Sequence, residues 1–179
     1  MHMLDHAPMA DSTLFPALPD DARCWVYPSD TPIAPETQTA LLEHVDAFLD
    51  DWASHNRPVQ GRATVLYDRF LVLAATLPDG GDISGCGIDA STHAIDEAAA
   101  ARGVTWVPSL HVVYRTPDGT VDTVSRSTFR TRVDDGSVTV DTTVFDPSVT
   151  TLGAVRHGAF EQPAGTSWHA RVFSIPETA

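Results

Sequence analysis

One segment of the chain limits the fold more than any other, because its apolar residues recur at the spacing of a helix. Within residues 35–55 they are Leu41, Leu42, Val45, Phe48, Leu49 and Trp52. They fill a stripe about 100° wide, and the acids of the segment lie on the opposite face. Pro35 suits a first helical position, and Asn56, just before Pro58, suits a left-handed closing residue. The pattern predicts one long amphipathic helix packed on a core.

Extended segments and a second helix accompany this helix in the sequence. The segments that predict strands are 23–27, 63–67, 70–77 and 110–115, and an Ala-rich helix is expected over 89–102. Asp68-Arg69 fits a hairpin turn, and the unbroken apolar run 70–75 is typical of a central strand. Asp89 is expected to cap the second helix. The order is β-α-β-β-α-β, which predicts a ferredoxin-like core.

The rest of the chain extends this core at both ends. Further strands are expected at 121–124 and 138–145, and short helices around Phe129 and over 150–157. Residues 1–21 contain three prolines and no periodicity, which is typical of a mobile arm. We therefore expect an α+β fold in a single domain, residues 22–179, with an N-terminal arm at 1–21 and a C-terminal β/α extension.

The charge of the chain restricts its partners. It carries 24 acids against 11 bases, a net charge of -13, and every base is Arg. Such a balance repels nucleic acid and anionic membranes, so neither is expected as a partner; a small ligand or a second copy of the chain stays open. Asp without Lys is typical of halophilic proteins adapted to molar salt, with a high-GC coding bias as the alternative. Because salt screens self-repulsion, we expect stability to rise with KCl concentration.

Several motifs are absent from the sequence. Cys24 and Cys86 do not make a disulfide framework, no signal-peptide pattern is present, and no apolar run reaches the roughly 20 residues of a membrane helix. We therefore expect a cytoplasmic protein. A chain without Lys has no GxxxxGK[ST] phosphate loop, and GxSxG, HExxH and CxxC are absent too. No motif implies a cofactor.

The segment 84–89 is the first candidate site. Its glycines allow close backbone approach, and the N-terminus of the helix that follows attracts anions and stabilises a thiolate. The candidate ligand-binding residues are Ser84, Gly85, Cys86, Gly87 and Asp89, with Cys86 also a candidate nucleophile. The alternative is that Cys86 packs as a small apolar residue. A metal site from Cys86, Asp89 and His93 lacks ligand spacing, so no metal is expected.

Aromatic and histidine residues supply the next candidates. Trp52 and His55 are three apart and share a helix face, although a histidine in a last helical turn is also favoured by the helix dipole. Trp168 and His169 follow a flexible segment and either close over a ligand or anchor the tail. Trp52 and Trp168 are candidate walls of a ligand pocket with the 84–89 segment. His55 and His169 are candidate catalytic bases for Cys86.

One basic island stands out in the acidic chain. Arg126, Arg130 and Arg132 fall close together, and the first two share a helix face. They either hold an anion or pair with nearby surface aspartates.

With these residues in view, the chain resembles a family of small uncharacterised bacterial proteins common in the Bacteroidetes, some labelled "ABC transporter ATPase". The matching features are Trp25-Val26-Tyr27, the Phe48…Trp52…His55 helix, Tyr67-Asp68-Arg69-Phe70, the 84–89 segment, Thr143-Val144-Phe145-Asp146 and Ser167-Trp168-His169. Relatives usually read SGCSID in the 84–89 segment, where this chain has Gly87 for the second Ser. They tend to carry Asp-Glu where this chain has Ala75-Thr76, and Phe-Asp-Arg where it has Trp106-Val107-Pro108. The resemblance implies no particular activity, and the ATPase label conflicts with the missing phosphate loop.

Three hypotheses of function follow. The first is an accessory module that binds a small ligand or a partner. The second is a small thiol-dependent enzyme that uses Cys86 with His55, His93 or His169, which requires a histidine nitrogen within about 4 Å of the sulfur. The third is a purely structural subunit, which requires an exposed apolar patch of several hundred Å². The absence of a recognisable catalytic set favours the first.

Overall fold

The computed structural model describes residues 13–177, which form a mixed α+β structure with three antiparallel sheets. The first half contains β1 (Arg23–Pro28), α1 (Pro35–Asp51), β2 (Ala53–Ser54), β3 (Arg57–Pro58), β4 (Gln60–Leu66), β5 (Phe70–Thr76) and α2 (Gly85–Ala100). The second half contains β6 (His111–Arg115), β7 (Val121–Ser125), α3 (Arg126–Asp134), β8 (Thr143–Phe145), α4 (Leu152–Arg156), β9 (Glu161–Pro163), a 3₁₀ turn (Ala164–Thr166) and α5 (Trp168–Phe173).

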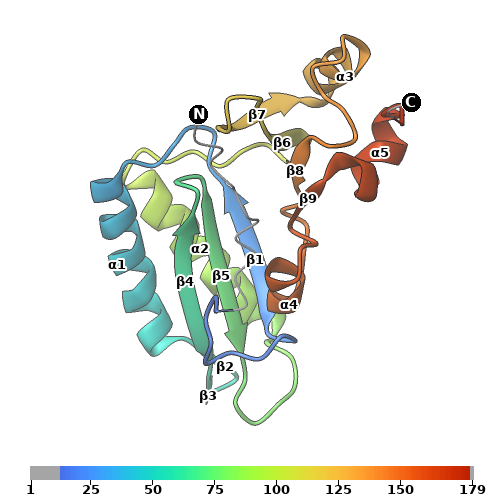
Figure 1. Ribbon diagram of the computed structural model, residues 1–179. Coiled ribbons are helices and arrows are strands. Elements are labelled where there is room, and N and C mark those ends of the chain that lie inside the picture. The colour runs from blue at the N-terminus through green and yellow to red at the C-terminus, as the bar shows by residue number, and fades with distance from the viewer. Residues whose placement is uncertain (1–12, 178–179) are drawn as a thin grey trace.

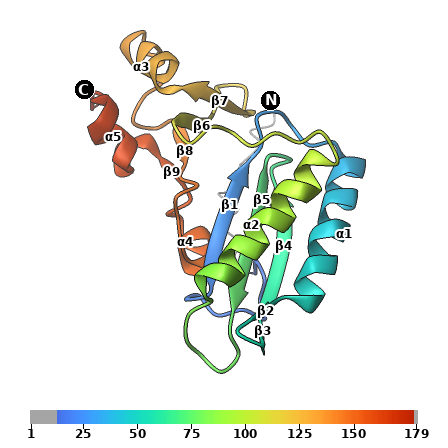
Figure 2. The same cartoon turned by 180° about the vertical axis from the view of Figure 1, so that it is seen from behind.

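The first sheet has the order β1-β5-β4, with β5 antiparallel to both neighbours. Residues 70–75 of β5 are completely buried, which confirms the predicted central strand. Tyr67 and Asp68 both have positive φ and make the tight turn between β4 and β5. The helices α1 and α2 cover one face of this sheet (Figure 2), where Leu41, Val45 and Leu49 pack on the strands. The core predicted from the helical stripe is therefore confirmed.

The predicted helix over 35–55 is four residues too long. It ends at Asp51, and the chain enters a small hairpin of β2 and β3. His55 and Asn56 both have positive φ and form the two-residue turn of this hairpin, a conformation typical of type I′ turns. The left-handed preference of Asn56 thus serves a hairpin rather than a helix end.

The ferredoxin-like core is a wrong prediction. Its fourth strand, β6, does not join the first sheet; it lies in a separate sheet of order β7-β6-β8-β9. Within residues 13–177, the outer edge of β1 has two isolated bridges, Arg23 with Thr151 and, just past the strand end, Ser29 with Trp106. The pairing does not extend past Val107, whose N–H donates to the Pro28 carbonyl oxygen at 2.8 Å. β6 instead pairs along its length with β7 across a turn at Gly119.

The second sheet is built from shorter pieces than predicted. The strand expected at 138–145 is reduced to β8, because a turn joins Thr139 to Thr142. The helices expected around Phe129 and over 150–157 are present as α3 and α4. α5 and the 3₁₀ turn before it were not predicted. A core of Tyr114, Phe129, Val144 and Phe173 with smaller residues lies beneath α3 and α5.

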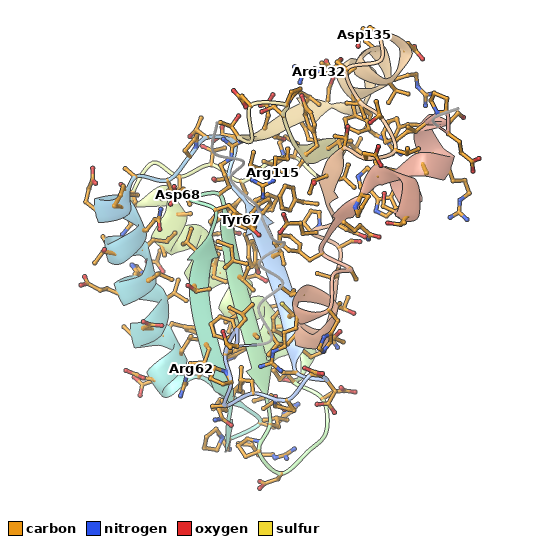
Figure 3. All side chains as sticks on the ribbon, viewed as in Figure 1. Arg62, Tyr67, Asp68, Arg115, Arg132 and Asp135 are labelled. Carbon is orange, nitrogen blue, oxygen red and sulfur yellow. The ribbon has the colours of Figure 1, made fainter. Side chains whose placement is uncertain are left out.

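The two sheets share a buried junction. On the face of the first sheet away from α1 and α2, Phe70 contacts Phe145 (ring centroids 4.8 Å) and Phe160 (5.1 Å). Beside them the Arg115 guanidinium lies over the Tyr67 ring, 4.9 Å from its centroid (Figure 3). Glu161 accepts hydrogen bonds from Tyr67 and, at 3.0 Å, from Arg115. The halves are thus joined by both aromatic packing and a half-buried ion pair.

The N-terminal segment is held by α4. Arg156 is buried and donates hydrogen bonds to the carbonyl oxygens of Leu14, Phe15 and Leu18 at 2.7–3.0 Å and to the Asp20 carboxylate at 2.7 Å. Of the arm expected at 1–21, residues 1–12 lie outside the described part of the chain, and the remainder is packed in this way. No helix within 13–177 is both long and apolar enough to cross a membrane.

Candidate functional site

The 84–89 segment forms the first turn of α2 rather than a loop before it. Ser84 is the N-cap residue, and its Oγ accepts a hydrogen bond from the Gly87 N–H at 3.1 Å. The expectation that Asp89 caps this helix is wrong, because Asp89 lies inside it and is exposed. Two glycines in a first helical turn disfavour a helix by propensity. The sequence pattern therefore placed the start of α2 too late. The cap of Ser84 outweighs that cost here.

The hairpin of β2 and β3 fixes this helix start in place. The Ser54 Oγ donates to the Ser84 Oγ at 3.0 Å and accepts from the Ser84 N–H at 2.9 Å. The buried Trp52 indole N–H donates to the Gly87 carbonyl oxygen at 3.0 Å. A Cβ on Gly87 would lie 3.0 Å from the Ile83 side chain. Trp52 therefore contacts the 84–89 segment as predicted. It is a packing contact between the start of α2 and the residue that precedes β2.

Cys86 stands on this turn without a catalytic partner. The thiol is exposed, and no hydrogen bond joins it to a histidine anywhere in residues 13–177. Gly85 is exposed beside it, with open space around its Cα. His55 lies in the turn of the small hairpin, so it does not share a helix face with Trp52, and His93 is two helical turns further along α2. Nor does the described chain hold three or more His, Cys, Asp or Glu placed for a metal ion.

Trp168 and His169 lie far from the 84–89 segment. They begin α5, which is at the opposite end of the molecule from β2 and β3 in both views (Figures 1 and 2). His169 is buried, its Nδ1 lies 3.0 Å from the Ser167 Oγ, and the half-exposed Trp168 stacks on its ring at 3.7 Å. Burial lowers the pKa of His169 to about 4. The predicted pocket of Trp52, the 84–89 segment and Trp168 therefore does not form, and Trp168 and His169 anchor the chain end.

The three arginines of the basic island all contact aromatic rings. The guanidinium groups of Arg126 and Arg130 lie 5.6 and 5.5 Å from the centroid of the Phe173 ring, within cation–π range. Arg132 lies over Tyr114 and pairs with Asp122 at 3.5 Å. These residues hold α3 to its neighbours, and they do not gather around an anion site.

A cavity of about 350 Å³ lies along the outer edge of β1. Its floor is residues 26–28 of β1, and its walls are residues 106–109, His111, Val113 and residues 147–148. The rings of Tyr27 and Trp106 are 5.6 Å apart beside it. Burial raises the pKa of Tyr27, opposed by a hydrogen bond with Thr92. The Trp106 indole N–H is buried and has no hydrogen-bond partner among residues 13–177.

A second cavity of about 340 Å³ lies beside Arg115, lined mostly by hydroxyl groups. Several of these groups already bond within their own turns. The Thr142 Oγ1 accepts from the Thr139 N–H at 2.9 Å, and the Ser137 Oγ donates to the Arg132 carbonyl oxygen at 3.2 Å. The Arg115 guanidinium is engaged by Glu161 and by the Gly119 carbonyl oxygen. The β1-edge cavity is therefore the better candidate, because one of its lining residues, Trp106, has a buried indole N–H without a partner among the described residues.

Sequence reasoning missed the β1-edge cavity although it noted part of its wall. In the sequence, Trp106-Val107-Pro108 stands out only as a departure from the bacterial family that the chain resembles, in which Phe-Asp-Arg is expected. Pro108 and Pro147 both line this cavity. Its lining comes from three separate segments of the chain, so no local pattern in the sequence marks it.

No protein-family model, curated protein or solved structure matches this chain.

Proposed function

We propose that this protein is a binding module, and that its ligand site is the cavity at the edge of β1. The observation that carries the proposal is the lining of that cavity. In a chain with 24 acids, none of the lining residues is an acid or an arginine. Apolar walls with a few unpaired polar groups are the usual make-up of small-ligand sites, and 350 Å³ is within their size range. The expected ligand is small, uncharged and largely apolar.

The geometry gives less support to a thiol-dependent enzyme. Such an enzyme needs a base in hydrogen-bond reach of its nucleophile, and Cys86 has none among the described residues. A purely structural subunit is also less well supported, because few large apolar residues are exposed: among residues 13–177 they are Leu110, Trp168 and Val172. The resemblance to the bacterial family stays a proposal; it implies that relatives carry charged groups where this cavity has Val107 and Pro108.

The test uses two uncharged probes, indole and N-acetyl-leucinamide, titrated into the ¹⁵N-labelled protein. We expect amide shifts of residues 26–28 and 106–111 with saturation in the millimolar range, typical of fragments this small. The exposed Ser109 lines the cavity, so Ser109→Trp should fill it and abolish these shifts. Ser127→Trp, at an exposed position on α3, is the matched control and should leave them unchanged. Shifts confined to other residues, or shifts that persist in Ser109→Trp, would contradict the proposal.

A further inference from the structure

The edge of β1 presents unpaired backbone groups at the floor of the cavity. At one end the Cys24 N–H donates to the Thr150 carbonyl oxygen at 2.9 Å, and at the other the Pro28 carbonyl oxygen accepts from the Val107 N–H at 2.8 Å. Alternate residues of a strand direct their N–H and C=O to the same edge. Val26, midway between Cys24 and Pro28, therefore directs both groups to this edge, and neither has a partner within residues 13–177.

The unpaired N–H and C=O of Val26 matter for binding because the residue is buried. Val26 is only 9% exposed and is one of the lining residues of the cavity. A backbone donor or acceptor that is removed from water without a partner destabilises the fold, so native proteins rarely leave one unpaired. A ligand that offers one acceptor and one donor at the spacing of a peptide group satisfies both. Unpaired strand edges are used in this way by proteins that add a peptide strand to a sheet.

The neighbouring segments set the length of what can pair here. Thr150 and Val107 occupy the two ends of the edge, four residues apart along β1. At about 3.3 Å per residue this leaves roughly 13 Å, which is room for about three extended residues. The lining is free of acids and arginines, which favours uncharged side chains in that segment.

We propose that the ligand of this cavity is a short, uncharged, extended peptide segment of about three residues, paired with the backbone of Val26. This inference rests on the proposed function, since it names the class of ligand for the same cavity. The peptide donates an amide N–H to the Val26 carbonyl oxygen and accepts the Val26 N–H through its own carbonyl. Its apolar side chains lie against the walls of the cavity.

The probe for the test is N-acetyl-Leu-Ala-Leu-N-methylamide, compared with three analogues that each carry one N-methylated amide. The side chains stay the same, and only one N–H donor is lost each time. We expect one analogue to bind about tenfold more weakly, while the analogue methylated at the adjacent amide, which points away from β1, keeps its affinity. We also expect hydrogen exchange of the Val26 amide to slow about tenfold at saturating peptide.

The outcomes separate the inference from the function on which it rests. If all four peptides bind equally in wild type, not in Ser109→Trp, and leave Val26 exchange unchanged, the cavity is a ligand site and the strand-pairing inference is wrong. If the peptides do not bind but indole still shifts residues 106–111, the inference also fails and the binding module stands. If neither peptides nor indole bind in the cavity, both fall.

Discussion

The two halves of the molecule differ in how far their structure is determined locally. The first sheet has strands of six and seven residues, and its helices α1 and α2 have 17 and 16 residues. The second half contains β8 and β9, each of three residues, and helices of nine, five and six residues. Helices this short are marginal alone and depend on tertiary packing.

The cores of the halves differ in the same sense. Under α1 and α2 the buried residues are mainly aliphatic and recur at regular spacing. Under α3 and α5 they are more aromatic, and arginines lie over the rings of Phe173 and Tyr114. We infer that the first half is held by the periodic pattern of its own elements, and the second by contacts between distant segments. The candidate ligand cavity lies between the two halves.

The largest effect is expected at the junction between the halves. Phe70→Ala removes a fully buried ring that contacts Phe145 and Phe160, and should cost about 3–5 kcal/mol. It should also uncouple the halves, so that amides of β8 exchange faster than amides of β5. The matched control is Leu73→Ala, which is equally buried on the opposite face of β5 and should destabilise both halves together. Equal acceleration of β5 and β8 exchange in Phe70→Ala would show that the halves do not separate.

The next largest expected effect is a loss of stability at low pH, and it arises in the second half alone. Burial lowers the pKa of His169 from 6.5 to about 4, so the unfolded chain binds a proton between these pH values and the folded chain does not. Stability is therefore complete above pH 6.5 and is lost as the pH falls to 4, by roughly 2–4 kcal/mol. His169→Phe should remove this part of the pH dependence while keeping a ring beside Phe129. The measurement is the urea unfolding free energy at pH 7, 5.5 and 4.5; parallel pH profiles for the two proteins would contradict the assignment.

A smaller effect concerns the segment that α4 holds. Arg156→Lys keeps the charge but has too few donors for three carbonyl oxygens and Asp20, and should cost about 2 kcal/mol. Arg171→Lys, at an exposed position on α5, should cost almost nothing. Exchange of the Leu18 and Ala22 amides should accelerate only in Arg156→Lys. Asp20 accepts from Arg156, which lowers the pKa of Asp20, so its contribution to stability is lost only as the pH falls below the ordinary aspartate range.

The contrast between the halves also explains which predictions succeeded. The stripe of Leu41, Val45 and Leu49 and the run at 70–75 are local patterns with one structural solution, and they gave α1 and β5 correctly. The pairing of β6 is a choice between two partners, the edge of β1 and the strand β7, and only the three-dimensional arrangement decides it. Periodicity carries no signal for that choice, so the ferredoxin-like order was wrong.

The candidate site was missed for a related reason. A cavity lined by three separate segments is not encoded at any one position, and its residues lie at 26–28, at 106–109 with 111 and 113, and at 147–148. The predicted site at 84–89 had a strong local signature instead, two glycines around a cysteine. That signature specified a helix start packed against Trp52. Close backbone approach was correctly inferred, and its purpose was structural.

The smallest expected effects compare the helix caps of the two halves. Ser84→Ala removes the cap of α2 and leaves Ser54 without its partner, and should cost about 1–2 kcal/mol. Ser125→Ala removes the equivalent cap of α3, where the neighbouring hydroxyls of Ser127 and Thr128 reach solvent, and should cost nearer 0.5 kcal/mol. Cys86→Ala should change stability by less than about 0.5 kcal/mol, because the thiol is exposed. Urea unfolding of the three variants gives this order. A larger cost for Cys86→Ala than for Ser84→Ala would mean that the thiol, and not the cap, is what the 84–89 turn is built around.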